Sequence, residues 1–231
     1  MSIEYHQREL TVALDPSNPA RAMPPILPKH RRILDVGCGM GQSLLAAQLP
    51  NDAEAYGVDC DIEAIETGRR LAPRNIKLVC ARGENLPFED KYFDLVFSRV
   101  ALPYMEINKA LLEISRVLKG GGDVWLTLHP ASMVFSRAKR SAWGGNLKDI
   151  VFCSYVLLNG VLFNCLGIQI SFLGRQETFQ TVGGIVRAMR RAGLMCLPVQ
   201  PSTHFVVQGQ KPSPDWDTKH EFFTHEEILT R

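Results

Sequence analysis

Apolar and polar positions along the first 130 residues fall into two alternating patterns. Short, almost continuous apolar runs predict buried strands, and apolar residues that recur every three or four positions predict helices with one packed face. Strands that alternate with helices at this pitch form right-handed βαβ units, which build a mostly parallel sheet with helices on both faces. The predicted strands are residues 33–36, 55–58, 76–80, 93–97 and 124–128, and the predicted helices are residues 42–49, 61–72 and 107–118.

The segments that flank this pattern are less regular. Five prolines between positions 16 and 28 favour an extended lead-in after a short helix at residues 5–14, since proline disfavours helix at the preceding residue. Gly120-Gly121-Gly122 is predicted to end the helix at 107–118. A last helix is predicted at 182–189, closed by Gly193, and two candidate strands follow at 195–199 and 204–208.

A glycine-rich turn, Asp35-Val36-Gly37-Cys38-Gly39-Met40-Gly41, follows the first predicted strand. Glycines there let the backbone approach a ligand at the carboxyl ends of the strands. A dinucleotide fingerprint needs G-x-G-x-x-G, but here the third glycine comes one residue early. The Asp35 carboxylate would repel a pyrophosphate and attract a ligand that carries a sulfonium and an ammonium. Spacing and charge therefore favour S-adenosylmethionine over a dinucleotide.

A second acidic residue, Asp59, ends the second predicted strand. A carboxylate at this position can accept hydrogen bonds from both hydroxyls of a ribose. The alternative is an N-cap of the following helix, for which Asp61 is the other candidate. Both roles can hold at once.

Several segments resemble, in order, those of one enzyme family. Residues 32–130 look like the class I methyltransferase domain, in the subgroup that resembles the ubiquinone/menaquinone C-methylation enzymes (methyltransferase type 11), and residues 205–212 are similar to its closing strand. The resemblance implies an α/β, Rossmann-like, seven-stranded, mostly parallel sheet with helices on both faces and a lid insertion before the last helix. The segments are Ile33-Leu34-Asp35-Val36-Gly37-Cys38-Gly39-Met40-Gly41, Gly57-Val58-Asp59, Gly83-Glu84-Asn85-Leu86-Pro87-Phe88, Phe93-Asp94-Leu95-Val96 and Glu113-Ile114-Ser115-Arg116-Val117-Leu118-Lys119-Gly120-Gly121-Gly122.

The resemblance also implies a binding site for S-adenosylmethionine at the strand ends. The family usually carries aspartate where this chain has Arg82, and arginine cannot accept the hydrogen bond of the adenine amino group. Either Glu84 or a backbone carbonyl takes that role, or packing and Gly83 alone hold the adenine. The implied residues are Asp35, Gly37, Cys38 and Gly39 in the turn, Asp59 at the ribose, Cys60, Arg82, Gly83 and Glu84 around the adenine, and Ser98 facing the sulfonium.

Methyl transfer from a sulfonium needs mainly alignment and exclusion of water, so no fixed catalytic signature is expected. His129 follows the fifth strand and is a candidate base, or else it only caps that strand. Tyr104 is a candidate for the pocket wall, or else an ordinary packed tyrosine. For Tyr5 and His6 in the lead-in, an ordinary exposed helix is favoured over a lid.

The segment between the fifth strand and the last helix is unusual. It begins with basic residues, and residues 151–173 then contain no charge. That length could reach across a bilayer, but polar residues and glycines interrupt it and the core pattern resumes afterwards, so no transmembrane span is expected. The alternatives are a lid or homodimer surface, an apolar pocket for a lipophilic or aromatic acceptor, and peripheral contact with a membrane.

Composition narrows the function. The formal net charge of +2 predicts no broad surface for nucleic acid. The closest of the six cysteines are 12 residues apart, so no C-x-x-C unit is present, and no metal site is expected. The N-terminus has no apolar signal region, which favours a reduced, cytoplasmic protein.

We therefore expect one domain that transfers the methyl group of S-adenosylmethionine to a small, apolar or aromatic acceptor and releases S-adenosylhomocysteine. The alternatives are a protein or RNA methyltransferase, and a non-catalytic protein that binds S-adenosylmethionine. The domain spans residues 1–231, with a lead or lid at 1–32, a cofactor-binding core at 33–130, an apolar lid insertion at 131–180, a C-terminal helix and strands at 181–211, and a tail at 212–231.

Overall fold

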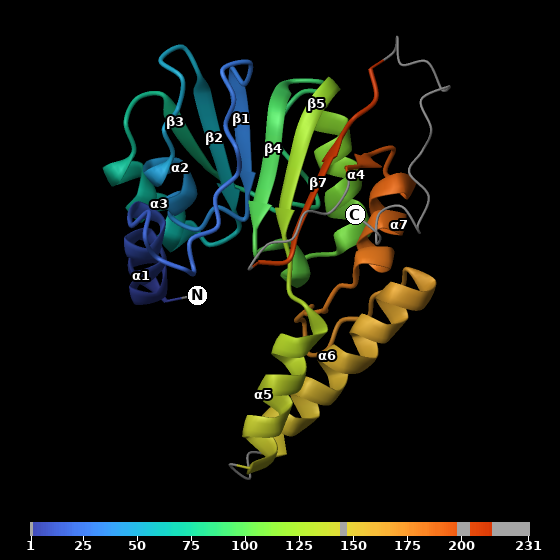
Figure 1. Cartoon of the computed structure of the whole chain (residues 1–231). Helices are drawn as coiled ribbons and strands as arrows, with labels where there is room; N and C mark the ends of the chain where they lie inside the picture. The colour runs from blue at the N-terminus through green and yellow to red at the C-terminus, as the bar shows by residue number, and fades with distance from the viewer. Residues whose placement is uncertain (1, 144–146, 198–203, 214–231) are drawn as a thin grey trace.

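A seven-stranded sheet forms the centre of the molecule (Figure 1). The computed structural model describes residues 2–143, 147–197 and 204–213. The strand order is β3-β2-β1-β4-β5-β7-β6; β1 to β5 are parallel, and β7 is antiparallel to both neighbours. This confirms the predicted Rossmann-like, mostly parallel sheet. The strands are β1 Arg32–Val36, β2 Glu54–Asp59, β3 Ile76–Cys80, β4 Phe93–Arg99, β5 Leu118–Thr127, β6 Met195–Cys196 and β7 Val206–Gln210.

Helices cover both faces of the sheet because side chains alternate along each strand. In β1, Leu34 packs in the cluster that contains the apolar faces of α4 and α7. Its neighbour Ile33 packs in the opposite cluster, with Leu44 of α2 and Ile65 of α3. The helices are α1 Ile3–Leu14, α2 Gln42–Ala46, α3 Ile62–Leu71, α4 Ile107–Val117, α5 Ala131–Trp143, α6 Leu147–Leu166 and α7 Val182–Arg191, with a 3-10 turn η1 at Leu102–Tyr104.

The glycine triplet does not end α4, so that prediction was wrong. The helix ends at Val117, and Gly120–Gly122 lie inside β5, where the register against β4 shifts. Gly121 adopts a φ of 77°, which a residue with a Cβ rarely adopts. Its N–H donates to the carbonyl of Lys211 at 2.7 Å, and the Lys211 N–H donates back to Gly122 at 3.0 Å. The glycines therefore form a bulge that extends the pairing with the end of β7.

Other predicted boundaries need smaller corrections. The helix expected at 42–49 ends at Ala46. The strand expected at 204–208 is β7, two residues later, and of the strand expected at 195–199 only Met195–Cys196 is formed in the described residues. Residues 198–199 and 214–231, which include most of the predicted tail, lie outside the described residues.

The predicted insertion contains a helical hairpin, α5 and α6, that projects away from the sheet (Figure 1). Val134 of α5 packs with Tyr155 and Val156 of α6 and with Phe179 in a small apolar cluster of its own. The hairpin follows directly on β5, so its base lies at the edge of the sheet where the parallel strands end.

Candidate functional site

One cavity of about 810 Å³ lies at the carboxyl ends of the parallel strands. Ligands of open α/β sheets bind at this edge. All the residues predicted for cofactor or acceptor except Ser98 line this cavity, although their individual roles stay predictions. They are Asp35, Gly37, Cys38, Gly39, Asp59, Cys60, Arg82, Gly83, Glu84, Tyr104 and His129.

The turn after β1 needs its glycines for two reasons. Gly37 and Gly39 have φ values of 79° and 56°, in the left-handed region. A Cβ on Gly37 would lie 2.1 Å from the Cβ of Ala101, and one on Gly39 would lie 2.5 Å from Nδ1 of His6. Between these glycines Cys38 is buried, and burial raises the pKa of its thiol, so Cys38 is a neutral part of the cavity wall.

Asp59 joins this turn to β2. Its Oδ2 accepts the N–H of Gly39 at 2.8 Å, and its Oδ1 accepts the N–H of Asp61 at 3.0 Å. The cap of α3 is Asp61, whose Oδ1 accepts the N–H of Ala64 at 3.2 Å. A carboxylate has about four acceptor positions, so Asp59 retains the capacity to accept two ribose hydroxyls.

Asp35 is buried in the cavity wall with a carboxyl oxygen, Oδ1, that has no hydrogen-bond partner among the described residues. Burial is the main reason that the pKa of Asp35 is raised to about 8, with smaller opposing effects from Arg99, which lowers it, and Asp59, which raises it. An unpaired buried acceptor costs about 1–3 kcal/mol, which a ligand that donates a hydrogen bond would recover. The ammonium group of S-adenosylmethionine fits this requirement.

The loop after β3 contains Arg82, the residue at which this chain differs from the family pattern. The side chain of Arg82 is 71% exposed and contacts Glu84 at 3.2 Å. The Glu84 side chain is only 12% exposed, lines the cavity, and accepts the N–H of Glu106 at 3.0 Å. Arg82 therefore contributes a solvent-facing charge, and Glu84 remains the candidate acceptor for the adenine amino group. Beside it Gly83 has no room for a side chain, because a Cβ would lie 2.6 Å from Sδ of Met105.

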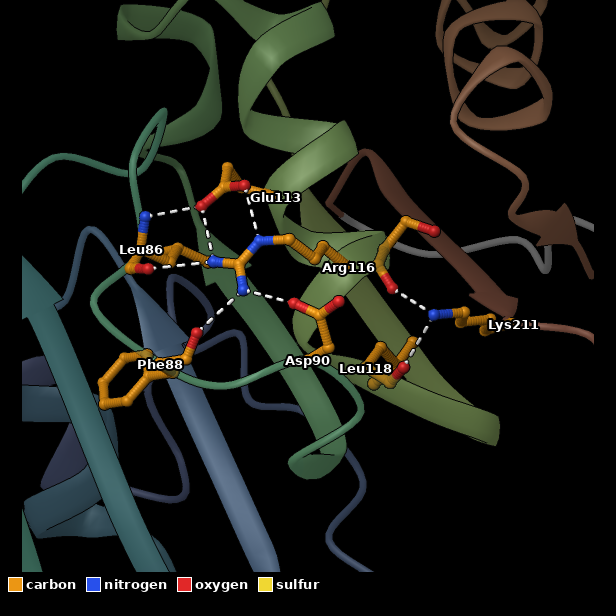
Figure 2. Close-up of polar contacts among 8 residues, drawn as sticks. Leu86, Phe88, Asp90, Glu113, Arg116, Leu118 and Lys211 are labelled. Atoms are coloured by element: carbon orange, nitrogen blue, oxygen red, sulfur yellow. Dashed lines mark hydrogen bonds and ion pairs between the residues drawn. The ribbon is translucent and has the colours of Figure 1, made fainter.

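Arg116, near the end of α4, holds the later part of this loop, from Leu86 to Asp90, in place (Figure 2). Its Nη2 donates to the carbonyl of Leu86 at 2.9 Å, and its Nη1 donates to the carbonyl of Phe88 at 2.8 Å. Glu113 accepts from Nε of Arg116 at 2.8 Å and from the N–H of Leu86 at 2.7 Å, and Asp90 pairs with Nη1 at 2.7 Å. Two of the segments that resemble the family are thus one hydrogen-bonded unit, and Arg116 positions the loop whose first residues, Arg82 to Glu84, line the cavity.

Replacing Arg116 by alanine is expected to lower the free energy of unfolding by about 2–4 kcal/mol, because two backbone carbonyls and two carboxylates lose a charged donor. We expect affinity for S-adenosylmethionine to fall about tenfold as the loop loosens, measured by calorimetric titration beside urea unfolding. Arg70→Ala, an exposed arginine of α3, is the control. Unchanged stability and affinity in Arg116→Ala would contradict this role.

Helix α1 closes one side of the cavity. His6 is buried, with Nδ1 3.3 Å from Nε2 of Gln42, so the exposed helix favoured from sequence is wrong for His6. Glu9 forms an ion pair with Arg99 at 2.8 Å, and Nε of Arg99 donates to Oγ of Ser43 at 3.1 Å. Glu9 and Arg99 could not be found from the sequence, since no local pattern pairs two residues 90 positions apart.

Ser98 is the one predicted site residue that does not line the cavity. It is fully buried in β4 and does not line the cavity, because the alternation along the strand turns Arg99 towards the cavity instead. The next residue, Val100, has a φ of 61°, which is strained for a β-branched side chain. Arg99 is therefore the residue of β4 that lines the cavity in place of Ser98.

Tyr104 and His129 lie together in the wall of the cavity, with ring centroids 5.4 Å apart and edge-to-face geometry. Burial lowers the pKa of His129, which favours a neutral imidazole that can accept a proton near pH 7. Burial raises the pKa of Tyr104 to about 12, so its phenol stays protonated. The backbone N–H of His129 donates to Oε1 of Gln180 at 3.2 Å, which fixes the main chain of His129 just after the end of β5.

Comparisons with known proteins agree with this geometry. Residues 34–126 match the family model described as a methyltransferase domain (Methyltransf_11). The uncharacterized methyltransferase YcgJ of Bacillus subtilis is 35% identical over 107 residues, 44% of this chain and 42% of that protein. The malonyl-[acyl-carrier protein] O-methyltransferase of Halorhodospira halophila is 35% identical over 124 residues, 52% of this chain and 41% of that protein.

Solved structures share the fold over most of the chain. The crystal structure of YcgJ from Bacillus subtilis superposes with a TM-score of 0.53 and 22% identity, covering 84% of this chain and 71% of that one. A chain of the complex between the Haloferax volcanii Trm112 methyltransferase activator and a methyltransferase gives a TM-score of 0.57 at 17% identity, covering 92% and 90%. At these identities the likeness concerns the fold alone.

The sheet order, the glycine turn and the acidic residues that line one cavity define a class I methyltransferase domain. Over residues 34–126, less than half of the chain, it is similar to the methyltransferase type 11 family, and it shares its fold with SAM-dependent methyltransferases of known structure, which indicates S-adenosylmethionine as the cofactor. The matches span less than half the length of the two curated relatives named above.

Proposed function

We propose that this protein transfers the methyl group of S-adenosylmethionine to a small, apolar or aromatic acceptor and releases S-adenosylhomocysteine. The observation that carries the proposal is that one continuous cavity is lined both by the glycine turn with its acidic residues and by apolar side chains. Its volume of about 810 Å³ is near the upper end of the range of roughly 300–1,000 Å³ for ligand sites, which leaves room beside a cofactor. The apolar wall includes Tyr104, Met105, Leu128, Met133 and Phe205.

When bound, S-adenosylmethionine supplies a methyl group on a positively charged sulfur. Asp59 would hold its ribose, Asp35 its ammonium group, and Glu84 its adenine amino group. Tyr104 and Met105 would exclude water and orient the acceptor, which is the main requirement of an in-line displacement. His129 would take a proton from an acceptor that arrives protonated.

The test is a transfer assay with radiolabelled S-adenosylmethionine and matched pairs of acceptors. In each pair, one acceptor is an aromatic compound with a hydroxyl or amine, and the other is a polar analogue of the same size. An acyl-carrier-protein-bound acid, a protein and an RNA are assayed in parallel, because one named relative acts on malonyl-[acyl-carrier protein]. We expect turnover of the apolar member of each pair. Preference for a polar or macromolecular acceptor, or cofactor binding without turnover of any acceptor, would overturn the proposal.

His129→Ala is expected to lower kcat about 10²–10⁴-fold for a protonated acceptor, while affinity for S-adenosylmethionine stays within about threefold. Because the pKa of His129 lies below its ordinary value, we expect the wild-type enzyme to keep its activity into mildly acidic pH. Tyr104→Phe is the matched control, since it retains the ring that contacts His129 and loses only the hydroxyl. If His129→Ala remains as active as Tyr104→Phe, His129 is not the base.

A further inference from the structure

The α5–α6 hairpin combines exposed apolar side chains with positive charge. Of the eighteen large apolar side chains that are exposed in the described residues, eleven lie between Met133 and Leu173. Residues 131–173 also contain four basic side chains and one acidic one, a net charge of +3 in a chain whose total is +2. An exposed apolar surface of this kind marks an interaction site.

The apolar side chains follow the geometry of the hairpin. Along α6, Leu147, Val151, Leu158 and Val161 are all about half exposed or more, and they recur at a spacing that places them on one side of the helix. Trp143 is the last residue of α5, at the free end of the hairpin, and its side chain is 96% exposed. A surface helix normally presents charged residues on its outward side, whereas α6 has no charged residue after its first turn.

The basic side chains lie next to this surface. Arg140 is exposed in the last turn of α5, and Lys148 is exposed in the first turn of α6, so both flank the free end of the hairpin. Lys139 is exposed beside Arg140, and Asp149 is the one acidic residue of the hairpin. Positive charge beside exposed tryptophan and leucine is the combination that binds the headgroup region of an anionic bilayer.

By length and composition α6 is also the one helix in the described residues that could cross a membrane. Its inner side argues against a span. Asn159 donates to the carbonyl of Glu177 at 3.0 Å and accepts the N–H of Ile170 at 2.8 Å. Asn164 donates to the carbonyl of Phe179 at 3.1 Å. These buried contacts fasten α6 to the segment that leads into α7 and the sheet, so the helix can lie on a bilayer but cannot insert alone.

We propose that the outer side and free end of the α5–α6 hairpin bind the surface of a membrane that contains anionic lipids. A second copy of the chain fits less well, because a symmetric dimer would bring two hairpins of net charge +3 together. The base of the hairpin, at Ser132 and Met133, lines the cavity. If the proposed methyl transfer to an apolar acceptor holds, the bilayer is the phase from which that acceptor enters.

Flotation with vesicles tests the surface directly. The full-length protein, without cofactor or acceptor, is mixed with vesicles of phosphatidylcholine alone or phosphatidylcholine with phosphatidylglycerol. We expect binding to the anionic vesicles, weakening as salt is added, and a blue shift of tryptophan emission that is absent in Trp143→Ala. Since no methyl transfer is measured, failure of this surface and failure of the proposed reaction are distinguishable.

Two double variants and a control separate the contributions. Arg140→Glu with Lys148→Glu, and Trp143→Ala with Leu147→Ala, are each expected to weaken vesicle binding at least about tenfold. Arg70→Glu with Arg74→Glu makes the same charge change at exposed positions in and just after α3 and should leave binding intact. Equal binding to neutral vesicles, or an equal loss of binding in the control, would overturn the proposal. It would also be overturned if the protein formed concentration-dependent dimers without binding vesicles and the Trp143→Ala, Leu147→Ala variant stayed monomeric.

Discussion

Replacing Asp59 by alanine is expected to weaken the binding of both S-adenosylmethionine and S-adenosylhomocysteine by at least about 100-fold, because the two charged hydrogen bonds that we propose to the ribose would be lost. Affinity should also fall for a second reason, which concerns the structure of the protein itself. Without its carboxylate, the N–H of Gly39 loses the acceptor that now lies 2.8 Å away, and the glycine turn is no longer braced against β2. Calorimetric titration measures the affinities, and NAD should bind to neither protein.

Asp61→Ala is the matched control for this experiment. It removes the cap of α3, two residues further along the chain, and leaves the Asp59 carboxylate in the cavity. We expect it to cost about 1 kcal/mol of stability and to change affinity for the cofactor less than threefold. The reverse result, with binding lost in Asp61→Ala and retained in Asp59→Ala, would make Asp59 a structural residue and would withdraw the ribose assignment.

The parts of the site that could be predicted from the sequence are those that local patterns determine. The turn after β1 is visible because glycine spacing, a preceding apolar run and an acidic residue occur within one short segment. Asp59 is visible because it ends a strand next to that turn. Both segments sit at the carboxyl ends of adjacent parallel strands, which the βαβ pattern already implies.

The parts that could not be predicted depend on pairing over long distances in the chain. Glu9 and Arg99 meet only because α1 folds back over the end of β4. Ser98 was expected to face the ligand, but Arg99, one residue later, lines the cavity, because a shift of one residue in a strand turns a side chain to the other face. The glycine triplet similarly reads as a helix stop, since its partner at Lys211 is about 90 residues away.

Asp35→Asn is expected to abolish a pH dependence of cofactor binding. In the cofactor-free protein the pKa of Asp35 is raised to about 8 by burial, so its carboxyl is mostly protonated at neutral pH. A cationic ligand beside it favours the carboxylate, and binding then releases a proton. Affinity for S-adenosylmethionine should therefore rise up to about tenfold per pH unit between roughly pH 6 and 8 and level off above, whereas Asp35→Asn should show a flat profile.

The stability of the cofactor-free protein should fall as the pH rises, whereas the affinity for the cofactor should increase. Because the pKa of the folded carboxyl lies above its ordinary value of 3.8, the protonated form stabilises the fold fully below about pH 4, and this contribution is lost as the pH rises through about 8. The amide introduced by Asp35→Asn cannot ionise, so the variant should gain stability relative to wild type between roughly pH 5 and pH 9, measured by thermal unfolding. Asp52→Asn, which changes an exposed carboxylate outside the cavity, is the control. If the slope of affinity persists in Asp35→Asn, another group releases the proton, and the buried carboxyl does not recognise the charge of the cofactor.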